Sequence, residues 1–242
     1  MSQTPDLSHV KALVFDVFGT VVDWRTSLIA DFTAWSAKRE IKGDWAGLVD
    51  AWRQAYKPSM DEVRKNPSAG FEVLDVLHRQ SLEKLIAQFS IKGLTGDDLD
   101  YMTTGWHRLK PWPDVAAGLT RLKTKFIIGT LSNGNVGLLT RMAKNAELPW
   151  DVVIPAELFE HYKPDREVYV GAARLLNLPP DEVMLVAAHN NDLAAARGFG
   201  LKTGFVARPA EYGPLQKQDF KAEVDWDIVA KDFGEVADRL GC

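Results

Sequence analysis

Short apolar runs that alternate with helical patterns constrain the fold of this chain more than any other feature. The runs are bounded by turn residues, as buried strands are, and they cover residues 11–15, 126–131, 152–154, 183–187 and 203–206. Apolar residues at helical spacing fall between them, over residues 114–123, 136–144, 166–176 and 192–199. Strands that alternate with helices form a parallel sheet covered by helices on both faces. The sequence therefore predicts an α/β fold.

Residues 24–112 interrupt this alternation with helical patterns alone. We expect helices over residues 28–38, 45–56, 72–89 and 97–109, and no strand among them. Pro111 and Pro113 close the region, and Asp114 is expected to cap the next helix. We predict a helical domain of residues 24–112 inserted into a core made of residues 1–23 and 113–242.

Composition narrows the class of protein. The chain has 242 residues, of which 46% are apolar and 26% charged, as in soluble globular proteins. Its net charge of -4 argues against a nucleic-acid or anionic-membrane partner. The single cysteine, Cys242, fits a reducing compartment, and no apolar run approaches the ~20 residues that span a bilayer. The N-terminus lacks the apolar run of a signal peptide. We expect a cytoplasmic protein.

Polar residues follow the expected strands, at the edge of the sheet where ligands bind. Asp16 directly follows the first run and could act as a nucleophile, or it could simply cap a turn. Ser132 and Asn133 follow the second run and could bind an anion, although a helix cap would use the same residues. Each segment alone allows both interpretations.

Two further segments reach the same edge. Lys163 precedes an expected helix and is either a solvated charge or a cation that keeps Asp16 ionised. Asp192 stands at the start of a helix, where the dipole favours a carboxylate, or it pairs with Lys163. His189 lies three residues earlier and alone is a weak signal. The five histidines are scattered without metal-site spacing, at positions 9, 78, 107, 161 and 189.

In this order, the segments resemble the motifs of the haloacid dehalogenase superfamily over nearly the whole chain. Asp16 with Thr20 resembles the first motif, and Ser132-Asn133 resembles the second. Lys163 and Asp192 resemble the third and fourth. The resemblance implies a Rossmann-like parallel-sheet core with a helical cap inserted after the first strand.

Two differences separate this chain from the Mg²⁺-dependent phosphatases of that superfamily. The phosphatases that this chain resembles carry a second Asp two residues after the nucleophile, and that Asp protonates the alkoxide that leaves. Phe18 occupies the same position here and cannot donate a proton. A halide leaves without a proton, so Phe18 is harmless to a dehalogenase. Ala187-Ala188 also stand where the phosphatases usually have Gly-Asp, which removes a carboxylate that Mg²⁺ would use.

The closer resemblance is to the L-2-haloacid dehalogenase branch. Its first motif is similar to Asp-x-Tyr-Gly-Thr, and its cap carries a Trp-Arg-Gln segment, found here around Arg53. Tyr169, six residues after Lys163, also fits the branch. The chain departs from it at Ala187 and His189, where Ser and Asn are common, and at Asn191, where an aromatic is common.

The resemblance implies a two-step reaction without metal or cofactor. Asp16 attacks C2 of an (S)-2-haloalkanoate, and water hydrolyses the ester to an (R)-2-hydroxyacid. The implied catalytic residues are Asp16, Thr20, Lys163, Asp192 and His189; the implied substrate-binding residues are Val17, Phe18, Arg53, Ser132, Asn133 and Tyr169. A small-molecule substrate and a homodimer are expected. A Mg²⁺-dependent phosphatase and a catalytically silent binding module are the alternatives.

Overall fold

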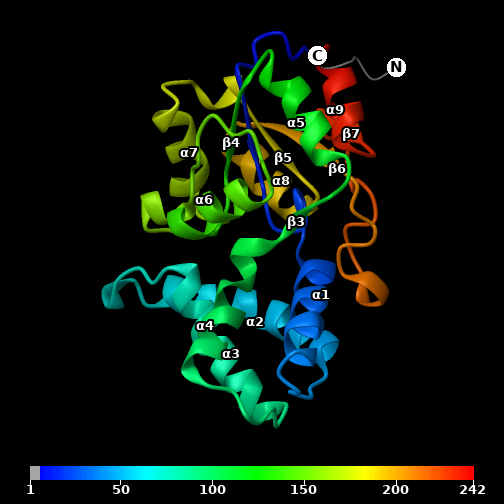
Figure 1. Cartoon of the computed structure of the whole chain (residues 1–242). Helices are drawn as coiled ribbons and strands as arrows, with labels where there is room; N and C mark the ends of the chain where they lie inside the picture. Colours follow the sequence, from blue (N-terminus) through cyan, green and yellow to red (C-terminus); the bar gives the residue numbers. More distant parts are fainter. Residues whose placement is uncertain (1–5) are drawn as a thin grey trace.

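The computed structural model of the chain describes residues 6–242 and places a parallel sheet above a group of helices (Figure 1). The sheet order is β4-β1-β5-β6-β7, and all its strands run parallel. These strands span Ala12–Phe15 (β1), Ile127–Thr130 (β4), Val183–Ala187 (β5), Lys202–Val206 (β6) and Ile228–Ala230 (β7). The predicted α/β sheet is thereby confirmed.

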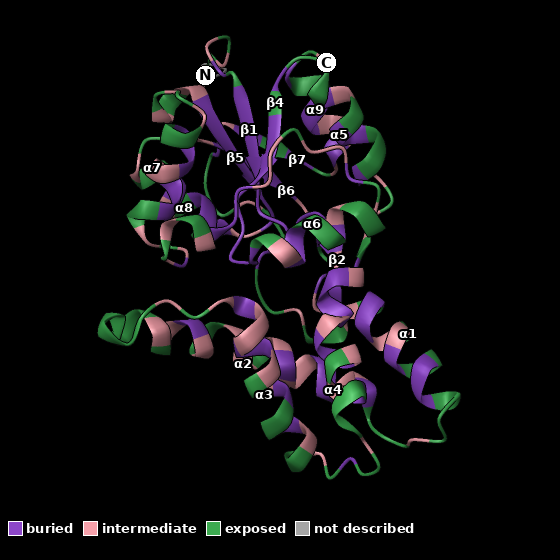
Figure 2. Cartoon of the chain, turned by 60° about the vertical axis from the view of Figure 1, so that its left-hand side comes forward, coloured by how far each residue is buried: buried purple, intermediate pink, exposed green. Residues whose placement is uncertain are grey.

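Most strand residues of the sheet are buried, as the colouring of Figure 2 shows, and their apolar side chains pack on both faces of the sheet. All residues of β1 and β5 are buried, which explains their uninterrupted apolar sequences. Burial of one such side chain stabilises the fold by roughly 1.5–3 kcal/mol. The covering helices, with α7 and α8 opposite α5 and α9, span Val115–Lys123 (α5), Arg166–Leu175 (α7), Asn190–Gly198 (α8) and Phe233–Arg239 (α9). The helix α6 covers Val136–Asn145.

The part of the chain from α1 to η2, between β1 and β4, forms the helical part drawn below the sheet in Figure 1. Its helices span Trp24–Ala37 (α1), Trp45–Lys65 (α2), Leu74–Gln88 (α3), Gly96–Thr103 (α4) and the 3-10 turn Thr104–Arg108 (η2). Side chains cap the starts of three of these helices: Asp23 and Asp44 accept N–H groups of α1 and α2, and Asp98 completes a capping box with Thr95 at α4. The helices match the predicted insertion, and its limits as a domain stay a prediction. We refer to this helical part as the cap.

Three expectations about elements were wrong. Residues 152–154 form no strand, because they join the edge of β4 only through one isolated bridge, between Val152 and Gly129, and Pro155 beyond them has no N–H to continue a ladder. A short strand β3 (Lys110–Pro111) does lie in the insertion and pairs antiparallel with β2 (Val22–Asp23) where the chain enters and leaves the cap. Asp114 precedes α5 without capping it, because its carboxylate accepts both Arg208 Nη groups at 2.9 Å.

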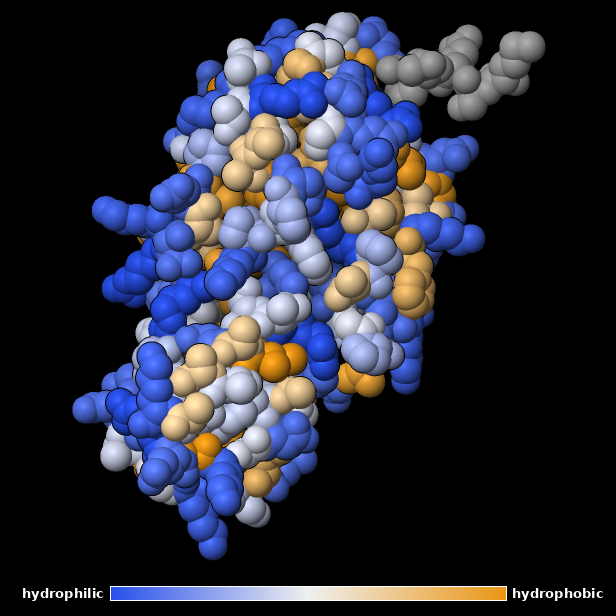
Figure 3. Space-filling view, turned by 45° about the vertical axis from the view of Figure 1, so that its right-hand side comes forward, coloured by the Kyte–Doolittle hydropathy of each residue, from blue (hydrophilic) through white to orange (hydrophobic). Residues whose placement is uncertain are grey.

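The surface of the molecule is mostly hydrophilic. On the face in Figure 3, hydrophilic side chains cover most of the molecule and hydrophobic ones show in small patches. Within residues 6–242, no helix has the length and apolar character that a membrane span requires.

Candidate functional site

The site is centred on Asp16, which follows β1 at the carboxyl edge of the sheet. β1 lies between β4 and β5, so the chain leaves it to one side and later returns on the other. Such a reversal opens a crevice beyond the strand ends. The carboxylate of Asp16 meets three donors there: Thr20 Oγ1 and His189 Nδ1 lie 2.7 and 3.1 Å from Oδ2, and Lys163 Nζ lies 3.4 Å from Oδ1.

A tight turn after Asp16 gives this carboxylate its surroundings. The N–H groups of Val21 and Val22 both donate to the carbonyl of Val17, at 2.9 and 3.1 Å. Gly19 has a φ of +87°, and a Cβ there would lie 2.1 Å from Oε1 of Glu211. Glycine is therefore required for two reasons, its conformation and the carboxylate packed against it.

Lys163 links the nucleophile to the fourth segment. Its Nζ donates to Oδ2 of Asp192 at 2.6 Å, and Tyr169 donates its hydroxyl to Oδ1 at 2.6 Å. Burial would lower the pKa of Lys163, but Asp192 and Asp16 outweigh it and raise that pKa. Burial would likewise raise the pKa of Asp16, yet Lys163 and His189 hold it well below its usual range. Asp16 is therefore ionised at neutral pH.

His189 stands between two carboxylates. Its Nδ1 faces Asp16, and its Nε2 lies 2.8 Å from Oε2 of Glu211. Burial would lower the pKa of His189, but Glu211 and Asp16 raise it well above its ordinary value. The ring is therefore an imidazolium that donates on both sides. Sequence reasoning did not find Glu211, because it lies in the irregular segment between β6 and β7 and belongs to no motif.

Arg53 reaches the site from α2. Its Cζ lies 5.4 and 4.5 Å from the ring centroids of Trp24 and Tyr56, and its Nη2 lies 3.6 Å from Oε1 of Glu211. Its Nη1 is buried and has no hydrogen-bond partner among the described residues. A buried charged donor without a partner costs free energy, so the guanidinium is suited to receive an anion.

An aromatic wall lies beside the nucleophile. The ring of Phe18 lies 6.2 Å from that of Tyr56 and 5.8 Å from that of Trp106, with edge-to-face geometry. His78 stacks on Trp106 at 4.4 Å, and burial lowers its pKa to about 3, so it is neutral. Phe18 carries no exchangeable proton, and neutral rings surround it. This side of the site therefore has no charged acid that could protonate a leaving group.

The second segment contributes through its polar atoms. Asn133 accepts the backbone N–H of Lys163 on Oδ1 at 2.8 Å, which fixes the loop that carries the lysine. Ser132 is fully buried, and its Oγ lies 3.4 Å from the N–H of Gly134. The segment thus both positions Lys163 and presents a hydroxyl.

The predicted residues therefore meet at one edge. Asp16, Thr20, Lys163, His189 and Asp192 are joined by direct contacts, and Arg53 joins them through Glu211. Within residues 6–242, no three His, Cys, Asp or Glu side chains are arranged to hold a metal ion. Lys163 lies between the two aspartates, Asp16 and Asp192, and offsets part of their charge. The set can hold an anion, present an ionised nucleophile and move protons.

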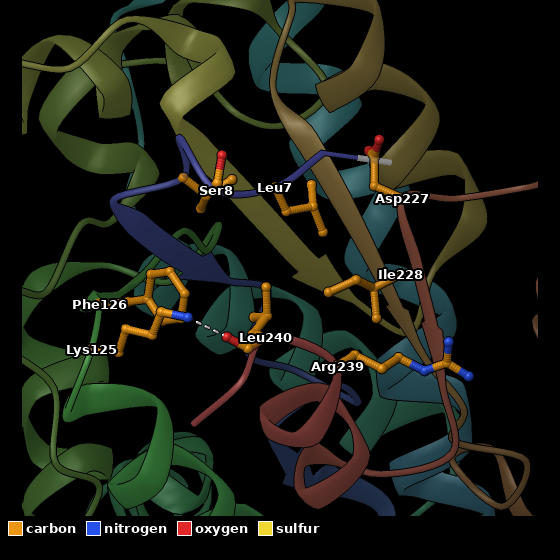
Figure 4. Close-up of a pocket in the computed structure, with 9 residues that line it drawn as sticks. Leu7, Ser8, Lys125, Phe126, Asp227, Ile228, Arg239 and Leu240 are labelled. Atoms are coloured by element: carbon orange, nitrogen blue, oxygen red, sulfur yellow. Dashed lines mark hydrogen bonds between the residues drawn. The ribbon is translucent and has the colours of Figure 1, made fainter. Parts of the chain in front are cut away.

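A separate cavity of about 330 Å³ lies at the opposite end of the strands (Figure 4). Val10, Phe126 and Ile228 line it close to the points where β1, β4 and β7 begin. It is therefore remote from Asp16 and takes no part in the site.

The chain is similar to known hydrolases in sequence and in fold. The family model of haloacid dehalogenase-like hydrolases matches residues 10–200. The solved L-2-haloacid dehalogenase PA0810 is 53% identical, with a TM-score of 0.91 over 96% of this chain and 99% of that one. The defluorinating L-2-haloacid dehalogenase Rha0230 is 44% identical, with a TM-score of 0.91 over 96% of each chain. The (S)-2-haloacid dehalogenase of Xanthobacter autotrophicus is 29% identical over 82% of this chain and 76% of that protein.

Proposed function

Because this chain belongs to the haloacid dehalogenase-like hydrolases, we propose that it is an (S)-2-haloacid dehalogenase. It converts (S)-2-haloalkanoates to (R)-2-hydroxyacids and halide through an ester on Asp16, with no metal or other cofactor. The observation that carries the proposal is the pairing of an ionised Asp16 with Phe18 two residues later. A leaving halide needs no proton, whereas a leaving alkoxide does.

In the first step, Asp16 attacks C2 from behind the carbon–halogen bond. Its Oδ1 is the attacking atom, because Oδ2 already accepts Thr20 and His189 whereas Oδ1 has only the longer contact with Lys163. The electron pair of the broken bond leaves with the halide, and configuration at C2 inverts. Splitting the displacement in this way is nucleophilic catalysis.

Substrate binding follows from the donors around Asp16. The free Nη1 of Arg53, with the Asn133 amide, receives the departing halide. The Ser132 hydroxyl and the backbone N–H groups near Val17 and Phe18 hold the substrate carboxylate. The rings of Tyr56 and Trp106, beside Phe18, enclose the alkyl group. Fixed donors of this kind cost no reorganisation when charge develops.

In the second step, water attacks the carbonyl carbon of the Asp16 ester. Thr20 donates to Oδ2, which becomes the carbonyl oxygen, and stabilises the charge that develops on it. Lys163, held by Asp192 and Asn133, stabilises the ionised form to which Asp16 returns when the ester is hydrolysed. Tyr169 fixes Asp192. His189 lies beside Oδ2 and, once ester formation has removed the charge of Asp16 and the ring has lost its Nδ1 proton, accepts a proton from the attacking water.

The phosphatase alternative is disfavoured. Phe18 cannot supply the acid, and Lys163 already pairs with both carboxylates that a magnesium ion would need. PA0810, Rha0230 and the protein from Xanthobacter autotrophicus match over 82% or more of the chain, and all three are named as dehalogenases. Expectations of a cytoplasmic location and a homodimer stay predictions, supported by the single cysteine and the family resemblance respectively.

Halide release separates these functions. The protein is expected to release halide from (S)-2-chloropropionate equally well with and without chelator, and at least about 100-fold more slowly from the (R) enantiomer, because backside attack fixes the position of C2. The product from the (S) substrate is (R)-lactate. Hydrolysis of an aryl phosphate that requires Mg²⁺, without halide release from either enantiomer, would contradict the proposal.

A further inference from the structure

Glu211 is buried and has partners on both oxygens, although no motif contains it. Its side chain is only 1% exposed. Oε2 faces Nε2 of His189 at 2.8 Å, and Oε1 accepts the indole N–H of Trp24 at 3.0 Å with Arg53 Nη2 at 3.6 Å. A buried carboxylate is costly unless it is paired. Glu211 is paired with both His189 and Arg53 of the proposed site.

We propose that Glu211 is a positioning residue for the second half-reaction: it holds the His189 ring so that Nδ1 faces Asp16 and can take a proton from the hydrolytic water. The inference rests on the proposed dehalogenase function. The geometry carries it, because a ring fixed at Nε2 by Glu211 can present only Nδ1 to the reacting carboxyl, and that atom lies 3.1 Å from Oδ2.

Alkylation of Asp16 changes what His189 can do. Before it, the imidazolium donates to Asp16 and to Glu211. Ester formation removes the charge of Asp16, so the proton on Nδ1 loses its anionic partner and leaves to solvent as the halide departs. Glu211 retains the proton on Nε2. The ring is then neutral, with a lone pair on Nδ1 beside the ester carbonyl.

The protons of the hydrolysis balance around this ring. Water adds to Cγ of the Asp16 ester, and its proton passes to Nδ1 of His189. The Oδ1–Cγ bond breaks, and the departing 2-hydroxyacid oxygen takes that proton. The carboxylic acid left on Asp16 returns its proton to Nδ1, which restores the ion pair of the resting enzyme. Over both steps, one water is consumed and one halide and one proton are released.

The charges around the ring favour this order of events. Asp16, Glu211 and Asp192 face Lys163, Arg53 and the protonated His189, so three anions oppose three cations. Esterification removes one anion only. Lys163 and His189 are the two cations in contact with Asp16. Lys163 keeps its shorter pair with Asp192 at 2.6 Å, whereas Nδ1 of His189 loses its anionic partner and only its Nε2 keeps Glu211.

The test follows the two half-reactions separately in Glu211→Gln, with (S)-2-chloropropionate and the full chain. We expect a burst of one chloride per site at the wild-type rate, then turnover slowed by about 100-fold or more, the contribution of a positioned acid–base group. Intact mass should show the ester on Asp16 accumulating. A pH indicator should show one proton released with the chloride burst. A residue with a purely structural role would slow both phases together.

Two further variants make the result decisive. Glu211→Asp keeps the charge and should slow hydrolysis less than Glu211→Gln, with the burst again unchanged, so the inference can be tested even if one variant folds poorly. Asp219→Asn alters another buried carboxylate of the segment between β6 and β7, one that binds Asn190, and should keep both phases. Equal slowing of both phases in the two Glu211 variants, or no ester accumulation, would overturn the role of Glu211. Wild-type protein that releases no chloride would instead refute the dehalogenase function.

Discussion

At the scale of single residues, the chemistry depends on how Asp16 is kept ionised inside the protein. Removal from water opposes its charge, and the ammonium of Lys163 with the imidazolium of His189 more than compensates. Its two oxygens are also unequal, since Oδ2 accepts two short hydrogen bonds and Oδ1 has only Lys163 at 3.4 Å. The environment therefore selects both the charge state and the attacking atom.

Replacing Lys163 tests this electrostatic account. In Lys163→Met, Asp16 loses its main counter-charge while Asp192 remains near, so the pKa of Asp16 should rise. The lowered pKa of Asp16 in the wild-type protein keeps its carboxylate ionised, and so active, down to acid pH. In the variant, whose Asp16 has a higher pKa, activity is lost at a higher pH because the carboxylate is protonated there. The acid limb of kcat/KM, measured from about pH 4 to 9, should move upward. Lys144→Met, at an exposed position of α6, should leave the limb in place. An unmoved limb in Lys163→Met would show that Lys163 does not set this pKa.

The sequence predicted most of the site residues and missed those that no local pattern marks. Asp16, Lys163 and Asp192 follow strands or begin helices, so the fold itself brings them together. Glu211 lies in an irregular segment, and its role arises from a contact with His189 that only the folded chain creates. The aromatic partners of Phe18 were expected only as a group, because helical spacing does not say which ring reaches the site.

At the scale of elements, the long patterns were reliable and the short ones were not. Fully apolar β1 and β5 were predicted because a strand buried on both faces leaves a clear trace in sequence. β7 has three residues, and β2 and β3 have two each, which is too short for any periodicity. Residues 152–154 are apolar like a strand, yet they meet β4 at one isolated bridge, and apolar content alone does not distinguish these cases.

Hydrogen bonds between the start of α6 in the core and α3 in the cap are expected to hold the two parts together. Asn135, at the start of α6, accepts the N–H of Asp75 at 3.3 Å and donates to its carboxylate at 3.0 Å, which joins core to cap. Asn135→Ala should destabilise the protein by about 1–3 kcal/mol and raise KM several-fold, because the cap is held less firmly over the substrate. Thermal unfolding and steady-state kinetics measure both effects. Asn145→Ala, exposed at the far end of α6, is the control; equal effects in the two variants would argue against a role in holding the cap.

At the scale of the whole molecule, core and cap each supply part of the charge set. The core carries Asp16, Lys163, His189, Asp192 and Glu211, and the cap carries Arg53. The segment between β6 and β7 joins the two, since Tyr212 packs on Trp24 at 5.6 Å while Glu211 meets Arg53. A separated cap would remove the anion-binding guanidinium and expose the ester to bulk water. The complete site therefore exists only with the cap in place, where excluded water strengthens the charged contacts.

Labelled water tests the central claim, that Asp16 is the nucleophile, in a single turnover with enzyme in excess over (S)-2-chloropropionate. In ¹⁸O-water, an ester on Asp16 requires the product to take its new oxygen from the carboxylate and water to replace that oxygen. The account predicts an unlabelled 2-hydroxyacid and one ¹⁸O in the Asp16 carboxyl, located by peptide mass. A labelled 2-hydroxyacid from the first turnover, with Asp16 unlabelled, would show direct attack by water and contradict the account.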